Sequence, residues 1–300
     1  MEIVSVDHIQ LNFNAQNLFY MNIVIGLMML GVSLDISRND IVSIVDYPKA
    51  LFIGLFAQFL LLPAFTFILI LFLQPYPSIA LGMILVSACP GGNLSNIITY
   101  LAKGNTTVSI IMTAMSSVIA IIMTPINFSI WGSLLPSTAS MIKAVHLNPF
   151  DVFITIFIIL GIPITVGQLI LRHYPNFAER IRQPFKVLSF VFFILMIIIV
   201  LAANYHNFIQ YVGVVILVVF LHNALALNIG YWSAYILRLS ERDCRAIAIE
   251  VGIQNSALGL VLVFNFFNGL GGMAIVVAFW GVWHLIAGLA AALFFSCRKI

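Results

Sequence analysis

The polar residues that could do chemistry fall in two short stretches of an otherwise apolar chain. CPGGNLSN begins at Cys89, and EVGIQNS begins at Glu250. Glu250 is the only acidic residue placed well inside an apolar segment of membrane-spanning length, where a charge costs roughly 2.5–3.5 kcal/mol on insertion scales. No Lys or Arg is expected at the same depth, so a bound cation is the simplest candidate for the group that balances the charge of Glu250. Carboxamides, hydroxyls and backbone carbonyls surround both stretches, and oxygen ligands suit hard cations.

Both stretches also contain residues that interrupt a helix. Pro90 has no backbone N–H, and Gly91, Gly92 and Gly252 are poor helix formers. Breaks at these points would free N–H and C=O groups, which survive at membrane depth only when buried in protein or lining a wet cavity. The alternative is that the polar residues bond neighbouring helices while the glycines aid close packing. Two breaks together with Glu250 favour a binding site.

The composition indicates what kind of protein positions these residues. Of the 300 residues, 62% are hydrophobic and 8% are charged, whereas an average soluble domain has roughly 25% charged residues. So few charges could not cover a globule in water, and we predict an integral membrane protein in contact with lipid. The basic residues are scattered at segment ends, which gives no reason to expect a nucleic-acid partner. The three cysteines show neither a disulfide framework nor a metal-ligand spacing.

Nine apolar segments are long enough to span a bilayer. Irregular backbone is not tolerated against lipid, so we predict an all-α fold of about nine transmembrane helices in one domain, residues 1–300. The residues before the first segment are expected to form a short extramembrane tail. The segments cover approximately residues 17–34, 49–73, 78–102, 106–134, 149–171, 187–205, 209–237, 245–268 and 272–296.

The basic residues predict the orientation. Of the 13 Lys and Arg residues, only Lys143 falls on the opposite side from the others under a nine-span count. The positive-inside rule then places the N-terminus outside and the C-terminus in the cytosol. We therefore expect a multi-pass protein of the cell (inner) membrane.

The two interrupted segments occupy matching places in the chain. Segments two to four and seven to nine form two three-helix units, each with the interrupted segment in its middle. Counterparts in the two units lie an odd number of spans apart, so the units would be inverted in the membrane. Interrupted helices in corresponding places of an inverted repeat are the sequence signature of a secondary-transporter binding site.

These motifs resemble the bile acid:sodium symporter family, including its bacterial members. The resemblance rests on CPGGNLSN, the following TYLAKGN, AIEVGIQNS, LHN at 221–223 and WH at 283–284, and it extends from about residue 20 onward. It implies a core domain with two crossing discontinuous helices (approximately 49–134 and 209–296) beside a panel domain (approximately 17–34 and 149–205). It also implies a sodium-coupled symporter that works by alternating access, with two sodium ions as coupling ions and no other cofactor.

The resemblance implies two sets of sodium ligands that share Glu250. Ser109 and Thr113 are four residues apart, and that spacing places them on one helical face; their alternative role is back-bonding to carbonyls one turn earlier. Gln58 could instead form a helix–helix hydrogen bond. The first set is Ser95, Asn96, Ser109, Thr113 and Glu250, and the second is Gln58, Glu250, Gln254 and the carbonyls of Val251 and Ile253.

The substrate implied by the resemblance is an organic anion, either bile acid-like or a smaller carboxylate. The second halves of the broken helices would offer free N–H groups and positive dipole ends to a carboxylate. Asn93 and Asn255 lie near those ends and, with His284, are the candidate substrate contacts. Relatives commonly carry Thr at the position of Asn93 and a polar residue at that of Leu285, which argues against bile acid itself. We interpret His222 as structural.

Three other functions fit the pattern less well. A proton-coupled or uncoupled organic-anion carrier would use the same scaffold, with Glu250 titrating instead of holding sodium. A non-transporting anion sensor would bind the anion without flux. An intramembrane enzyme is disfavoured because the chain has no GxSxG, HExxH or DDxxD motif. The expected partners are sodium, an organic anion and membrane lipid.

Overall fold

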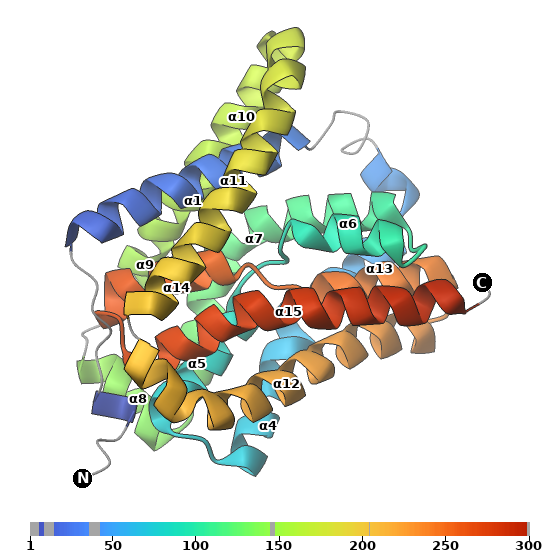
Figure 1. The fold of residues 1–300 in the computed structure, drawn as a ribbon. Coiled ribbons are helices and arrows are strands. Elements are labelled where there is room, and N and C mark those ends of the chain that lie inside the picture. The colour runs from blue at the N-terminus through green and yellow to red at the C-terminus, as the bar shows by residue number, and fades with distance from the viewer. Residues whose placement is uncertain (1–5, 9–14, 36–42, 145–147, 204, 299–300) are drawn as a thin grey trace.

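The computed structural model describes residues 6–8, 15–35, 43–144, 148–203 and 205–298, and the prediction of an all-α fold is confirmed (Figure 1). Within these residues the β pairing is one isolated bridge, between Gly91 and Gln254. The longer helices are α1 (Ala15–Asp35), α3 (Pro48–Phe56), α4 (Leu62–Leu73), α5 (Pro77–Ala88), α6 (Leu94–Leu101), α7 (Thr106–Ser133), α8 (Pro136–Ala144), α9 (Pro149–Ile156), α10 (Ile162–His173), α11 (Pro175–Ala203), α12 (Tyr205–Ile236), α13 (Glu241–Gly252), α14 (Ser256–Phe267) and α15 (Gly271–Cys297).

Each of the nine predicted segments corresponds to a helix or to consecutive helices. Two features differ from the prediction. The helix α11 begins at Pro175 rather than near residue 187, because hydropathy marks the apolar part of a helix and not its charged first turns. The short helix α8 (Pro136–Ala144) was not predicted, since its mixed polar sequence has no apolar stretch of spanning length.

Among the described residues, five stretches are long and apolar enough to cross a membrane by length and composition. The helices on either side of the two breaks are individually too short to qualify, and α1 and α11 do not qualify over their described residues, so the count of nine spans remains a prediction. The five stretches are Pro48–Leu73, Thr106–Ser133, Phe150–His173, Val215–Ile236 and Gly271–Cys297.

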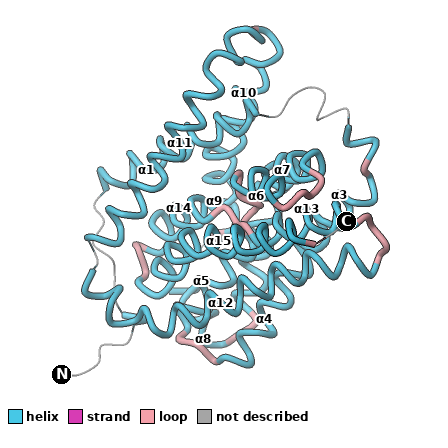
Figure 2. Tube along the Cα trace, turned by 45° about the vertical axis from the view of Figure 1, so that its right-hand side comes forward, coloured by secondary structure: helices cyan, strands magenta, loops and turns pink. Residues whose placement is uncertain are grey.

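The helices pack in two groups. The helices α1, α10 and α11 pack mainly on one another, and in both views they project from the remainder (Figures 1 and 2). In the other group, α12 packs along α13, and α5 packs between α15 and α7. The helix α9 continues through η4 into α10 of the first group and packs on α7 of the second, and α1 contacts α14; these contacts join the groups. This arrangement places the two interrupted helix pairs, α5–α6 and α13–α14, inside the second group.

Two π-helical turns each precede a proline. The turn η3 (Ala57–Leu61) joins α3 to α4 before Pro63, and η4 (Phe157–Gly161) joins α9 to α10 before Pro163. Proline has no N–H to bond the carbonyl four residues earlier, so Pro63 leaves the Phe59 carbonyl without its helical donor. The Asn127 side chain of α7 donates to that carbonyl over 2.9 Å. Gln58 lies within η3, beside this interruption.

Residues 6–8, which precede α1, contact the helical body. In the short 3₁₀ helix Val6–His8, the Val6 side chain is buried. The Asp7 carboxylate accepts a hydrogen bond of 2.8 Å from the backbone N–H of Ser78, in the first turn of α5. An anion at this position is favourable because the N-terminus of a helix carries a positive partial charge.

Candidate ion-binding site

Both interrupted helix pairs have a short extended segment at the break. α5 ends at Ala88 and α6 begins at Leu94, while α13 ends at Gly252 and α14 begins at Ser256. At the first residue of each interval, Cys89 and Ile253, the backbone is in the β region. The residues predicted to break the helices lie there: Pro90, Gly91 and Gly92 in the first interval, and Gly252 at the end of α13.

The two extended segments cross and hydrogen-bond to each other. The Gly92 N–H donates to the Ile253 carbonyl over 2.7 Å, and the Asn255 N–H donates to the Pro90 carbonyl over 2.9 Å. These bonds flank the antiparallel bridge between Gly91 and Gln254. Each break therefore satisfies polar backbone groups that the other leaves without a helical partner.

The surroundings of the glycines at the breaks leave little room for a side chain. A Cβ atom on Gly91 would overlap the Glu250 carboxylate, and one on Gly92 would lie 3.0 Å from the Gln254 carbonyl oxygen. A Cβ atom on Gly252 would overlap the Leu227 side chain of α12. Gly91 and Gly92 thus permit the crossing as well as interrupting the helix, while Gly252 permits close packing of α13 against α12.

The Glu250 carboxylate lies at the centre of the first cluster of oxygen atoms. Its Oε2 accepts from Ser95 Oγ and, over 3.1 Å, from Ser109 Oγ, and its Oε1 accepts from Thr113 Oγ1 over 2.7 Å. Glu250, Ser95 and Ser109 are fully buried. Asn96 Oδ1 completes the cluster, 2.8 Å from Ser109 Oγ and 3.2 Å from Thr113 Oγ1. The structure thus brings together all five residues of the first predicted sodium set, from α6, α7 and α13.

This cluster has more acceptor oxygens than hydroxyl protons. Ser109 Oγ is within bonding distance of both Asn96 Oδ1 and Glu250 Oε2, and Thr113 Oγ1 is close to Asn96 Oδ1, Glu250 Oε1 and the Ser109 carbonyl. A hydroxyl has a single proton to donate. Several oxygens therefore face one another without a shared proton, an arrangement that a hard cation would stabilise.

A second cluster surrounds Gln58 and Gln254, both buried. Gln58 Nε2 lies 2.8 Å from the Cys89 carbonyl and 2.8 Å from Gln254 Oε1. Gln254 Nε2 donates to the Val251 carbonyl over 2.6 Å, and the Ile253 carbonyl accepts from Gly92. Four of the five members of the second predicted set are therefore gathered here: Gln58, Gln254 and the carbonyls of Val251 and Ile253. The fifth, Glu250, makes the side-chain hydrogen bonds described above within the first cluster, and amide N–H groups already donate to both carbonyls.

The two asparagines predicted to bind substrate lie at the starts of α6 and α14. Asn255 Oδ1 accepts from the Leu258 N–H over 3.1 Å and so caps α14, and its Nδ2 lies 3.9 Å from Met29 Sδ of α1. Asn93 is at the corresponding position before α6, half-buried, and its side chain makes no capping hydrogen bond. Asn255 thus contacts both helical groups.

The two histidines differ in their surroundings. His222 Nε2 is 2.7 Å from Thr66 Oγ1, and its ring packs at 4.7 Å between centroids against Trp280. That bond supports our interpretation of His222 as structural. His284 is 3% exposed, and within the part of the chain that the structure describes neither ring nitrogen has a hydrogen-bond partner. Its nitrogens remain available to a bound ligand or water.

Two residues of this region were not assigned a role from the sequence. Asn223 Nδ2 donates to the Gly252 carbonyl over 2.7 Å and so holds the end of α13; an amide within an apolar helix was the available signal. Arg245, fully buried, bonds Glu241 at 3.0 Å, the Ala102 carbonyl at 3.1 Å and the Arg298 carbonyl at 3.3 Å. It joins the start of α13 to the C-terminal ends of α6 and α15.

Residues 22–211 match the family model described as Sodium Bile acid symporter family. The chain is 31% identical to the uncharacterized sodium-dependent transporter YocS of Bacillus subtilis, over 95% of this chain and 87% of that protein. It is 31% identical to the probable sodium/metabolite cotransporter BASS2, chloroplastic, of Oryza sativa (92% and 64%) and 24% identical to the human ileal sodium/bile acid cotransporter (81% and 68%). These relatives are transporters and not enzymes. The chain belongs to the sodium bile acid symporter family.

Proposed function

We propose that this chain is a sodium-coupled symporter that carries an organic anion across the cell membrane by alternating access. Membership of a family of sodium-dependent transporters supports the coupling ion. The names of its relatives include bile acid and metabolite cotransporters, so an organic anion is the substrate class that we infer for this chain.

The observation that carries the proposal is the environment of Glu250. Three hydroxyls contact its carboxylate, and within the described ranges it has no Lys or Arg close enough to form a salt bridge. A buried carboxylate without a cationic partner is strongly unfavourable. A sodium ion bound among Ser95, Asn96, Ser109, Thr113 and Glu250 would supply the positive charge that offsets the Glu250 carboxylate.

A second sodium would bind at the Gln58 and Gln254 cluster. For that, the Gln58 and Gln254 amides must turn their oxygens toward the ion, which releases the Val251 carbonyl from Gln254 Nε2. The Ile253 carbonyl can keep its bond from the Gly92 N–H and offer its second lone pair to the ion. Glu250 belongs to this second proposed set as well as to the first, so the two ions would share its charge. Filling the cluster would therefore stiffen the crossing of the two breaks.

The organic anion would bind beside this crossing, where α6 and α14 begin. Their first turns present N–H groups and the positive ends of helix dipoles, with Asn93, Asn255 and His284 as side-chain contacts. We assign residues 49–134 and 209–296 to a core and 17–34 and 149–205 to a panel. Sodium that organises the crossing would favour the core arrangement that binds the anion, and this differential affinity is coupling.

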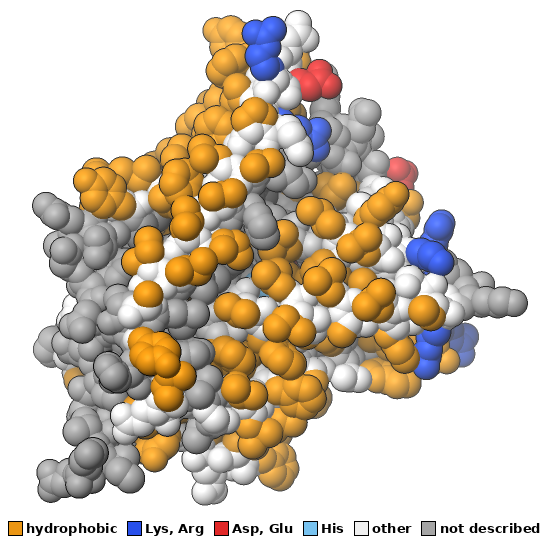
Figure 3. Space-filling model, viewed as in Figure 1, with side chains coloured by type: hydrophobic (Ala, Val, Ile, Leu, Met, Phe, Trp, Pro, Cys, Tyr) orange, Lys and Arg blue, Asp and Glu red, His pale blue; other side chains and the backbone are white. Residues whose placement is uncertain are grey.

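The distribution of basic residues supports the proposed orientation. In Figure 3, Lys and Arg gather at the tip formed by α10 and α11 and near the C-terminal end of α15, while hydrophobic side chains cover most of the face between them. We assign the side of the protein that carries both groups of Lys and Arg to the cytosol, which leaves the N-terminus outside.

The test is uptake into proteoliposomes with an imposed sodium gradient or with choline in its place, over a panel from bile acids to short carboxylates. We expect sodium-dependent accumulation of at least one anion and its loss in Glu250→Gln. Asp151→Asn, an exposed acid-to-amide change in the first turn of α9, is the matched control and should retain uptake.

Other outcomes would contradict the proposal. Uptake that follows a pH gradient and ignores sodium would assign Glu250 to proton coupling. Sodium-dependent anion binding without flux would indicate a sensor. Full sodium stimulation in a folded Glu250→Gln protein would remove Glu250 from the ion site.

A further inference from the structure

Two asparagines join the two helical groups at a place apart from the crossing of the breaks. Asn265 Nδ2, near the end of α14, donates to Asn22 Oδ1 of α1 over 3.1 Å, and Asn22 Nδ2 lies 3.5 Å from Asn265 Oδ1. Both side chains are half-buried. A carboxamide both donates and accepts hydrogen bonds, so the two side chains form a reciprocal pair. The sodium and anion sites proposed above do not use this pair.

The pair lies at one end of a longer contact between α1 and α14. At the other end, Met29 Sδ of α1 is 3.9 Å from Nδ2 of Asn255, the residue that caps α14. Asn22 and Met29 are seven residues apart, which places them two turns apart on one face of α1. Asn255 and Asn265 are roughly 15 Å apart along α14 at 1.5 Å per residue. The two helices therefore run antiparallel along this contact, which extends from the candidate anion contact Asn255 to the end of α14.

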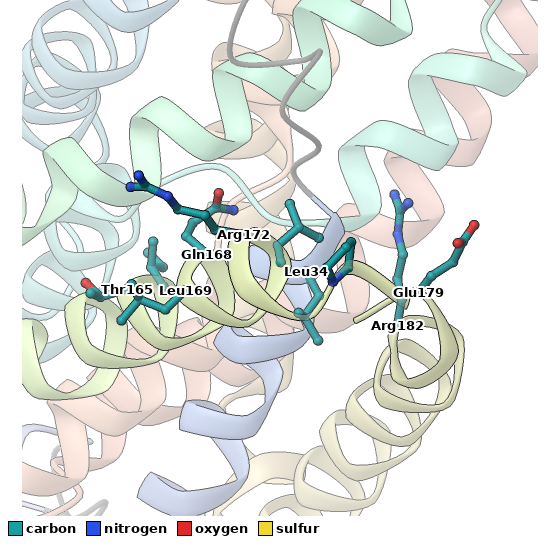
Figure 4. Close-up of a pocket in the computed structure, with 10 residues that line it drawn as sticks. Leu34, Thr165, Gln168, Leu169, Arg172, Glu179 and Arg182 are labelled. Carbon is teal, nitrogen blue, oxygen red and sulfur yellow. The ribbon is translucent and has the colours of Figure 1, made fainter. Parts of the chain in front are cut away.

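The opposite end of α1 has different surroundings. Ser33 Oγ donates to the Ile164 carbonyl of α10 over 2.6 Å. Leu34 lines a cavity of about 1060 Å³ together with residues of α10 and α11, and Figure 4 shows Leu34 between side chains of those two helices. Ser33 and Leu34 thus contact helices of the same group as α1, whereas Asn22 and Met29 contact the other group.

We propose that the Asn22–Asn265 pair holds closed the outer end of the path that leads between the two groups to Asn255. This inference rests on the proposed function, in which panel and core part alternately on the two sides of the membrane and the start of α1 is outside. In that orientation Asn22 lies toward the outer surface and Met29 lies deeper, against Asn255, which is 8% exposed. Asn22 and Asn265 are then positioning residues: they set the balance between a closed and an open outer side without touching the anion.

An amide pair suits a contact that must form and break. Apolar helices gain little from one another that lipid does not also supply, and interhelical hydrogen bonds in a membrane are only modestly stabilising. Asn265 Nδ2 also donates to the Val261 carbonyl of its own helix over 2.8 Å, so the Asn265 amide keeps one partner when the helices part. The pair can therefore stabilise the closed arrangement without making it permanent.

The test uses a reporter cysteine, Met29→Cys, in intact cells treated from outside with a membrane-impermeant maleimide. Labelling is measured above that of the same chain without the reporter, because the chain has three native cysteines. We expect Asn22→Ala and Asn265→Ala each to speed labelling roughly 3- to 10-fold, which is the population shift that an interhelical hydrogen bond in a membrane supplies. The double variant should be no faster than either single variant, since each change alone removes the whole pair.

The matched control is Asn228→Ala in α12. Asn228 Nδ2 donates to the Ala224 carbonyl one turn earlier over 2.8 Å, as Asn265 does to Val261, but among the described residues it bonds no second helix. This variant should label at the rate of the reporter protein. Equal acceleration by Asn228→Ala would indicate general loosening, and unchanged labelling in both single variants would show that the pair only packs two helices. Additive acceleration in the double variant would indicate two independent effects, and each of these three results overturns the proposal.

Two features keep the test decisive. Asn22→Leu and Asn265→Leu remove the same hydrogen bonds with side chains of similar volume, and they replace any alanine variant that folds poorly. The labelling needs neither sodium nor an identified anion, so its failure leaves the sodium-uptake test unaffected. Conversely, a carrier without sodium coupling would still show the faster labelling.

Discussion

Thr113→Val removes one hydroxyl from the Glu250 cluster while keeping the shape of the side chain. Thr113 Oγ1 lies 2.7 Å from Glu250 Oε1 and 3.2 Å from Asn96 Oδ1. A hydrogen bond to a charged group contributes about 1.5–3 kcal/mol, and a comparable loss of sodium affinity follows if this oxygen is a ligand. A change of about 1.4 kcal/mol in binding free energy changes a dissociation constant tenfold. We therefore expect the half-saturating sodium concentration to rise roughly 10- to 100-fold.

The assay is initial anion uptake into proteoliposomes as a function of sodium concentration. Thr113→Ser keeps the oxygen and should remain near the wild-type value. Ser117→Ala is the control on the same helix, because its hydroxyl donates to the Thr113 carbonyl over 2.8 Å and does not bond Glu250 in the described part of the structure. It should alter sodium dependence little.

Two results would refute this reasoning. A folded Thr113→Val protein with wild-type sodium dependence would show that the hydroxyl cluster is structural. A large change in the half-saturating anion concentration at saturating sodium, without a change in sodium dependence, would place Thr113 in the anion site instead.

Three further predictions test the surrounding structure. Gly91→Ala should abolish sodium-stimulated uptake because its Cβ would overlap the Glu250 carboxylate, whereas Gly213→Ala in α12, where a Cβ meets nothing within 4 Å, should retain uptake. Arg245→Gln should lower stability by roughly 2–4 kcal/mol, since it removes hydrogen bonds that join three helix ends, and thermal unfolding in detergent measures this loss. Asn223→Leu should weaken sodium dependence by roughly tenfold in uptake assays by releasing the Gly252 carbonyl, and wild-type dependence would refute that role.

Local chemistry made the helix breaks predictable from the sequence. A single proline need not end a helix, since Pro125 lies inside α7, but a proline followed by two glycines removes a backbone donor and places two poor helix formers together. Pro90, Gly91 and Gly92 therefore indicate an interruption without knowledge of the fold. The position of Glu250 within an apolar segment likewise indicates that its carboxylate has a positively charged partner. The grouping of hydroxyls from α6 and α7 around it was anticipated through the family resemblance, and the helical spacing of Ser109 and Thr113 agreed with it.

Features that depend on distant contacts could not be predicted in this way. The bridge between Gly91 and Gln254 joins residues far apart in the chain, and no local pattern encodes which backbone groups pair. Arg245 has the same sequence context as surface cations at other segment ends, but it is buried because three helix ends meet around it. A cavity beside Arg172 is lined by residues of α1, α10 and α11, and hydropathy does not specify how these helices pack.

The crossing of the two breaks has a consequence for biosynthesis. The Gly92 N–H bonds a carbonyl that the ribosome adds roughly 160 residues later, at Ile253, which at ~5–20 residues per second is an interval of roughly 8–32 s. During that interval the nascent first half holds unsatisfied backbone groups that hydrocarbon does not tolerate. The half-made protein must therefore remain beside the insertion machinery, or in a hydrated setting, until α13 and α14 emerge. Premature release or truncation before Glu241 would present quality-control proteases with an incompletely inserted chain.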